Sequence, residues 1–152
     1  MHDRPAMLFD LDGTLVDSVY QHVLAWRHAL FDQGFDLSAW RIHRRVGMSG
    51  GLLVHALGRE VPVVTRDEVP FAKPDPDLFL AAAARVDAPI GSCIVVGDSV
   101  WDILAARRAG TLGVGVLSGG YSRQELEVAG AFRVYQDPAA LEERLDELGI
   151  RR

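Results

Sequence analysis

Two carboxylates one residue apart stand at the end of a short apolar run near the N-terminus. Asp10 and Asp12 follow the apolar residues 7–9 and come just before Gly13. Because side chains alternate along a strand, the two carboxylates are expected to share a face, and glycine lets the backbone turn close to a bound anion. Neighbouring carboxylates repel unless a cation compensates them. The pattern is typical of phosphoryl transfer assisted by a divalent cation, although a strand with an ordinary Asp-Gly turn fits the same residues.

A second acidic pair follows another apolar run. Asp98 comes directly after residues 94–96 and Gly97, and Asp102 lies four positions further on, where a helix is expected to begin. Mg²⁺ prefers hard oxygen ligands and keeps several waters, so a few carboxylates from two strand ends suffice to hold it. Asp98 and Asp102 are therefore candidate metal ligands, although Asp102 alone also fits a helix N-terminal acid.

Two basic side chains are candidates for contact with a phosphorylated substrate. Lys73 lies on a loop stiffened by Pro74 and Pro76, where its charge could neutralise phosphate. His22 lies on an expected helix, four positions before Trp26. A solvated lysine and an ordinary histidine on an amphipathic helix are the alternatives, so both assignments depend on the other motifs.

Short apolar runs alternate with helical stretches, which is the pattern of a parallel sheet covered by helices. The expected strands are residues 7–9, 61–64, 94–96, 112–116 and 132–135. The expected helix signals are Pro76 in a first turn, Gly110 and Gly130 as stops, Ser122 with Glu125 as a capping box, and a last helix over 138–148. These elements predict an α/β fold.

The interval from 17 to 58 differs from the rest of the chain. It has no strand signal and places its apolar residues at helical spacing. A glycine-rich break at residues 47–51 divides it into two helical parts. We therefore expect an α/β core formed by 1–16 and 59–152, with a partial helical cap inserted over 17–58.

Composition narrows the class of protein. A chain of 152 residues that is 49% hydrophobic is long enough for one core with a small appendage. The net charge of −5 argues against nucleic acid as a partner, and a cluster at Arg41, Arg44 and Arg45 fits a solvated helix face. Cys93 is the only cysteine, which suits a reducing cytoplasm, and neither a signal peptide nor a membrane span is expected.

The motifs together resemble the haloacid dehalogenase (HAD) superfamily of phosphohydrolases. Three segments carry the resemblance: residues 7–18, the Lys-Pro-Asp-Pro run at 73–76, and Gly-Asp-Ser-x-x-Asp at 97–102. His22 with Ala25 and Trp26 looks like the start of the helical cap in the branch of β-phosphoglucomutase and phosphoglycolate phosphatase. The resemblance implies a Rossmann-like three-layer fold with a mostly parallel sheet.

The resemblance also implies a role for each matching residue. Asp10 would be the nucleophile that forms an aspartyl-phosphate, and Asp12 the general acid and base. Asp10, Asp98, Asp102 and the backbone carbonyl of Asp12 would hold Mg²⁺. The implied phosphate- and substrate-binding residues are Gly13, Thr14, His22, Thr65 and Lys73.

One departure from the family pattern concerns the interval between Asp10 and Lys73, which are only 63 positions apart. The family places a complete cap and a second core strand there, and that strand ends in a phosphate-binding Ser or Thr. A segment is therefore expected to be missing around residues 57–61, with Thr65 as a substitute hydroxyl. Its loss would expose a sheet edge or pair residues 61–65 with residues 7–10.

The leading hypothesis is a Mg²⁺-dependent phosphatase that acts on a small phosphorylated metabolite, as a monomer or homodimer. A phosphomutase of the β-phosphoglucomutase type is an alternative, but residues 48–51 offer no cation for a second phosphate. A catalytically impaired phosphate-binding or interaction module is the other alternative, because the second core strand is missing.

Overall fold

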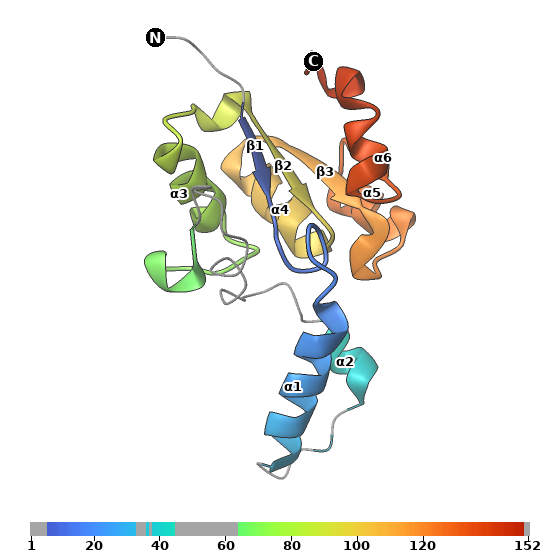
Figure 1. The fold of residues 1–152 in the computed structure, drawn as a ribbon. Coiled ribbons are helices and arrows are strands. Elements are labelled where there is room, and N and C mark those ends of the chain that lie inside the picture. Colours follow the sequence, from blue (N-terminus) through green and yellow to red (C-terminus); the bar gives the residue numbers. More distant parts are fainter. Residues whose placement is uncertain (1–5, 33–35, 37, 45–63, 151–152) are drawn as a thin grey trace.

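The fold is a parallel sheet with helices on both faces. The computed structural model describes residues 6–32, 36, 38–44 and 64–150. Its four strands lie in the order β1-β2-β3-β4 and are all parallel (Figure 1). The strands are β1 Ala6–Phe9, β2 Cys93–Gly97, β3 Leu112–Val116 and β4 Arg133–Tyr135. Four of the five expected strands are thereby confirmed.

Among the described residues, three helices cover one face of this sheet and one helix covers the other. Leu8 and Val95 point toward α3 (Asp77–Arg85) and α4 (Val100–Ala109), while α5 (Arg123–Ala129) packs beside α4. Val96, Val114 and Tyr135 face α6 (Pro138–Glu142) on the opposite side. Alternating side chains therefore build a core on each face of the sheet, and the predicted three-layer α/β architecture is confirmed.

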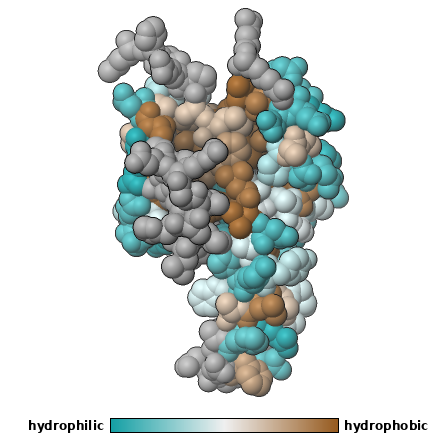
Figure 2. Space-filling model, viewed as in Figure 1, coloured by the Kyte–Doolittle hydropathy of each residue, from teal (hydrophilic) through white to brown (hydrophobic). Residues whose placement is uncertain are grey.

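Strand β1 lies at the edge of the described sheet, where its one described partner is β2. Figure 2 shows hydrophobic atoms along the middle of the viewed face, and Phe9 at the end of β1 is 41% exposed. Of the strand expected at 61–64, residues 61–63 lie outside the described part of the chain. Val64 and Thr65 are not in a strand, and Thr65 instead precedes a 3₁₀ turn at Arg66–Glu68.

Helices α1 (Val19–Asp32) and α2 (Ala39–His43) pack against each other beyond the carboxyl end of β1 (Figure 1). Val19, Val23 and Ile42 are their buried hydrophobic residues. This agrees with a helical start to the interval 17–58, whereas the break expected at 47–51 and the second helical part lie outside the described residues. None of the described helices is long and apolar enough to cross a membrane.

Most of the expected helix-end signals are found. Gly110 and Gly130 adopt the left-handed conformation after α4 and α5, and Ser122 forms the capping box with Glu125. Pro76 is the N-cap of α3 and so lies one position before its first turn.

The single last helix predicted over 138–148 is wrong, because α6 ends at Glu142 and a 3₁₀ turn follows at Leu145–Leu148. Acidic residues 142–143 oppose the dipole at a helix end, and the 3₁₀ turn packs its leucines on the sheet.

Candidate active site

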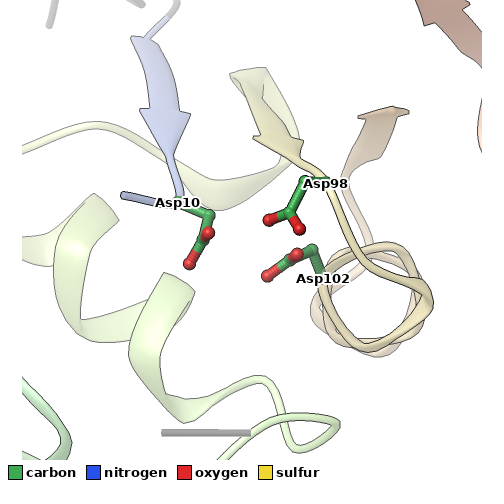
Figure 3. A group of neighbouring side chains, drawn as sticks. All are labelled: Asp10, Asp98 and Asp102. Carbon is green, nitrogen blue, oxygen red and sulfur yellow. The ribbon is translucent and has the colours of Figure 1, made fainter. Parts of the chain in front are cut away.

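The carboxyl ends of β1 and β2 bring the first acidic residues together. Phe9 is in register with Val96, and the backbone N–H of Asp10 donates to the Val96 carbonyl at 2.8 Å. Asp98 therefore follows β2 beside Asp10, and Asp102 joins them from the first turn of α4. One carboxylate oxygen from each of the three lies within 4.8 Å of the others (Figure 3).

Lys73 lies between two of these carboxylates. Its Nζ is 2.5 Å from Asp10 Oδ1 and 2.6 Å from Asp102 Oδ1, and the residue is only 7% exposed. Burial lowers the pKa of Lys73, but the charges of Asp10 and Asp102 outweigh it and hold that pKa above its usual value. The ammonium is therefore charged at physiological pH and tied to the cluster.

Asp98 is the acid of the cluster that makes no ion pair with the described residues. Burial, then the charges of Asp102 and Asp10, raise the pKa of Asp98 to about 8. Its described donor is the Thr14 hydroxyl, which lies 3.1 Å from Asp98 Oδ1 and 3.3 Å from Asp10 Oδ2. Three carboxylates beside one ammonium leave an excess negative charge, and oxygen ligands of this kind suit a hard divalent cation. The residues therefore fit a metal such as Mg²⁺.

Asp102 is held at the start of α4 by Ser99. The backbone N–H and the hydroxyl of Ser99 donate to Asp102 Oδ2 at 3.0 and 2.6 Å. The hydroxyl also accepts from the Asp102 N–H, so the two residues form a complete capping box. Asp102 is fully buried and directs its other oxygen at Lys73. It is thus both a helix-capping acid and a member of the carboxylate cluster.

The side chain of Asp12 points to the helical cap and lies outside the three-carboxylate cluster. Ser18 donates its hydroxyl to Asp12 Oδ1 at 2.6 Å, and His22 Nε2 lies 3.2 Å from the same oxygen. His22 comes from the first turn of α1 and Ser18 immediately precedes that helix. The structure therefore joins Asp12 to α1 through His22.

Gly13 shapes the turn between Asp12 and Thr14. It has a φ of +84°, and a Cβ there would lie 2.7 Å from Asp98 Oδ2 and 2.6 Å from Val19. Its N–H donates to the Val16 carbonyl at 2.7 Å. Gly13 therefore allows the close approach of the turn to Asp98, while its own donor is already used within the turn.

Thr65 makes no described hydrogen bond or ion pair to any other expected site residue. Its hydroxyl donates to Asp67 Oδ1 at 2.5 Å and also lies 3.1 Å from Glu68 Oε1. Those contacts cap the 3₁₀ turn at Arg66–Glu68. The threonine therefore serves a local structural contact.

Three serines contact the site residues without having been predicted to do so. Ser99 had a sequence signal, since Ser-x-x-Asp is a capping pattern. Ser18 lay inside the N-terminal motif but had no stated role. Ser118 donates its hydroxyl to the Gly13 carbonyl at 2.5 Å from 105 positions away, and nothing local in the sequence marks that contact.

Comparison with known proteins gives consistent matches. A family model described as HAD-hydrolase-like matches residues 70–141. A crystal structure of a hydrolase from Pseudomonas syringae is 40% identical, with a TM-score of 0.87, and the match covers 95% of this chain and 99% of that one. A phosphoglycolate phosphatase of Rhodospirillum rubrum is 35% identical over 127 residues, covering 82% of this chain and 52% of that protein. The chain thus spans about half the length of this curated relative.

A third match includes positions that this chain lacks. The fructose-1-phosphate phosphatase of Escherichia coli is 27% identical over 179 aligned positions, covering 72% of this chain and 95% of that enzyme. The alignment is longer than the 152 residues of this chain, so it includes positions that have no counterpart here. With the fold and the site residues already described, these matches show that the chain belongs to the haloacid dehalogenase superfamily of hydrolases, in the branch of the phosphoglycolate phosphatases and β-phosphoglucomutases.

Proposed function

We propose that this protein is a Mg²⁺-dependent phosphatase that removes phosphate from a small phosphorylated metabolite in the cytoplasm. The observation that carries the proposal is the buried cluster in which Lys73 bridges Asp10 and Asp102 beside Asp98. Relatives named as phosphoglycolate phosphatase and fructose-1-phosphate phosphatase support a small phosphomonoester as the substrate.

The cation would be held by Asp10 and Asp98, with Asp102 and the backbone carbonyl of Asp12 as further ligands. When bound, Mg²⁺ supplies positive charge to the phosphoryl oxygens. Thr14 orients its two carboxylate partners, since its hydroxyl lies between Asp98 and Asp10. Lys73 provides the second positive charge at the site and holds the nucleophilic carboxylate in place.

Asp10 is the proposed nucleophile. One of its oxygens attacks phosphorus, the bond from phosphorus to the leaving oxygen breaks, and an aspartyl-phosphate forms. Water then attacks the same phosphorus, which releases inorganic phosphate and regenerates the Asp10 carboxylate. The first step requires the Asp10 oxygen to lie in line with the bond to the leaving oxygen, and the contact with Lys73 restrains that carboxylate. In the second step the water attacks opposite the Asp10 oxygen, and the bond between that oxygen and phosphorus breaks.

Asp12 is the proposed general acid and base. In its protonated form it gives a proton to the leaving oxygen, and as a carboxylate it later takes a proton from the attacking water. Ser18 and His22 both contact Oδ1, so Oδ2 is the oxygen available for this transfer. Because His22 belongs to α1, movement of the cap over 17–58 relative to the core would change the orientation of Asp12.

Thr65 stays a predicted phosphate ligand. Binding phosphate through its hydroxyl requires the hydrogen bond to Asp67 to break. Gly13 is proposed to act through the shape of the turn, because its N–H already donates to Val16. Lys73 is therefore the better-supported phosphate-binding residue, and Thr14 is the better-supported residue for orienting the carboxylates.

A catalytically impaired phosphate-binding module is a second candidate. It is favoured by the position of β1 at the edge of the described sheet and by the engagement of Thr65 with Asp67. This candidate has the same charge cluster and the same cation. It differs in predicting Mg²⁺ and phosphate binding without turnover.

The test is hydrolysis of p-nitrophenyl phosphate by the purified chain, with and without Mg²⁺, beside Asp10→Asn. Asp75→Asn is the matched control, because Asp75 is a half-exposed aspartate paired with Arg108. A phosphatase requires Mg²⁺-dependent turnover that is lost in Asp10→Asn and kept in the control. A folded chain that gains thermal stability from Mg²⁺ and phosphate without turnover would support the binding module and contradict the phosphatase.

A further inference from the structure

The loop after β3 touches both acidic motifs, although the proposed reaction gives it no role. Strand β3 is followed by a 3₁₀ turn at Leu117–Gly119. Because β1, β2 and β3 are parallel, this turn lies at the carboxyl ends of the strands, on the same side of the sheet as Asp10 and Asp98. Two consecutive residues of the turn, Ser118 and Gly119, make different contacts there.

Ser118 restrains the backbone of the turn that connects Asp12 to Thr14. Its hydroxyl donates to the Gly13 carbonyl at 2.5 Å. Gly13 lies between Asp12, whose carbonyl is a proposed cation ligand, and Thr14, whose hydroxyl reaches Asp98. Because the peptide unit is planar, fixing the Gly13 carbonyl also fixes the N–H and the starting direction of Thr14.

Gly119 gives the Asp98 carboxylate its space. A Cβ on Gly119 would overlap Asp98 Oδ2, and a Cβ on Gly13 would lie 2.7 Å from the same oxygen. Asp98 is therefore confined between two glycine backbones, with the Thr14 hydroxyl 3.1 Å from its other oxygen. A carboxylate confined on both sides has few rotamers, which favours a fixed ligand geometry.

We propose that Ser118 is a positioning residue for the cation site, acting through the Gly13 carbonyl on Thr14 and Asp98. This inference rests on the proposed function, but the cation alone is enough to test it. Ser118 contacts neither the phosphoryl group nor the cation in this role. A serine that merely packs the loop would affect stability without changing cation affinity.

The experiment compares Ser118→Ala with Ser118→Thr, which keeps a hydroxyl. Ser92→Ala is the matched control, since Ser92 also donates to a backbone carbonyl, that of Pro89 at 2.8 Å, within its own local turn. For each protein, kcat and KM for p-nitrophenyl phosphate and the Mg²⁺ concentration for half-maximal rate are measured. A separate thermal-shift titration with Mg²⁺ alone gives the concentration for half-maximal stabilisation.

Loss of one hydrogen bond is expected to raise both Mg²⁺ concentrations about threefold to tenfold and to lower kcat by a similar factor. KM should stay within about twofold, Ser118→Thr should recover most of the loss, and Ser92→Ala should match the wild type.

The proposal is overturned if Ser118→Ala keeps the wild-type Mg²⁺ requirement, or if Ser118→Thr is as impaired as Ser118→Ala. If the wild type binds Mg²⁺ without turnover, the phosphatase proposal fails and the thermal-shift titration still decides the role of Ser118. If Mg²⁺ has no effect on the wild type in either assay, there is no cation site to position, and this proposal fails as well.

Discussion

The charged side chains of the carboxylate cluster and those of the ion pair between Arg44 and Glu125 differ in burial. In the core, Lys73 is buried between Asp10 and Asp102, and the strands that carry the acids are joined by backbone hydrogen bonds. In the cap, Arg44 just after α2 pairs with Glu125 on α5, and both side chains are more than one third exposed. The pair of Lys73 with Asp10 is thus buried, whereas the pair of Arg44 with Glu125 is open to water.

The difference in burial implies a difference in energy. An exposed ion pair contributes about 0–1 kcal/mol, whereas removing one partner of a buried pair costs about 3–5 kcal/mol. The Arg44 guanidinium also lies 4.5 Å from the Tyr121 ring centre, and the Tyr121 hydroxyl donates to the Arg44 carbonyl at 3.0 Å. The exposed ion pair of Arg44 with Glu125 is therefore expected to break more readily than the buried cluster.

The largest expected effect is that of Lys73→Met. Lys73 is the only lysine in the sequence, and its loss leaves Asp10 and Asp102 buried without their cation. We expect kcat/KM to fall by roughly 10³-fold and unfolding to occur at a lower temperature in the absence of Mg²⁺. Steady-state kinetics and thermal melts measure both effects. Arg108→Gln, which breaks the exposed pair with Asp75, is the control, and equal losses in the two variants would remove the contrast between buried and exposed charges.

The next effect concerns pH and metal removal. The pKa of Asp98 is raised from 3.8 to about 8 in the folded chain, so the folded state keeps a proton that the unfolded state releases. Stability of the metal-free protein should therefore fall, by a few kcal/mol at most, as pH rises from about 5 to 8. The carboxyl groups of Glu68 and Glu125, with pKa values lowered to about 2, are already ionised in this range.

Melts of EDTA-treated protein across this pH range, repeated with Mg²⁺, test the effect of Asp98. Mg²⁺ should stabilise more at the higher pH, because it binds the ionised carboxylate. Asp98→Asn, which imitates the protonated form, should reduce the fall, and the remainder is expected from Asp102, whose pKa burial also raises. A metal-free melting temperature that rises with pH would contradict the raised pKa of Asp98.

A smaller effect is expected for Gly119→Ala. The added Cβ overlaps the Asp98 carboxylate, whereas a Cβ on Gly91 meets nothing within 4 Å. We expect at least about a tenfold higher Mg²⁺ requirement for Gly119→Ala and no change for Gly91→Ala. Mg²⁺ titrations of rate and of melting temperature compare the two. Equal behaviour of both alanine variants would mean that the loop after β3 adapts and does not confine Asp98.

The smallest effect is expected at the boundary of cap and core. Glu125→Gln breaks the ion pair with Arg44 but keeps a side chain suited to the capping box with Ser122. We expect kcat for p-nitrophenyl phosphate to change by less than about twofold and the melting temperature to move little. Steady-state kinetics at low and high salt provide the measurement. A large loss of activity would show that the cap contact is as important as the core cluster.

Local pattern identified most of the fold. The strands at 94–96 and 112–116, the stop at Gly110 and the Ser122 capping box are found as expected, because apolar runs, left-handed glycines and caps depend on neighbouring residues. The helix expected to continue to residue 148 ends earlier, because packing of its leucines on the sheet competes with local helix propensity.

The sequence by itself determined which groups are available for chemistry. Asp10, Asp98 and Asp102 follow strands or begin a helix, and Lys73 precedes a helix on a proline-rich loop; such positions can be read from the order of residues. The resemblance to known motifs then indicated their roles. The sequence left two interpretations open for each acid: an ordinary turn or capping residue, or a member of one carboxylate cluster. The structure shows that Asp102 caps α4 and also belongs to the cluster.

Only the tertiary structure decided which of these groups meet. Ser118 donates to the Gly13 carbonyl, 105 positions away, because the carboxyl ends of parallel strands lie together. Thr65 bonds to Asp67 and not to the carboxylate cluster. The tertiary structure also decided the ionisation of the cluster, since burial and the charges of Asp102 and Asp10 raise the pKa of Asp98. Contacts between distant residues and desolvation depend on how the layers pack, and neither is encoded in the spacing of residues along the chain.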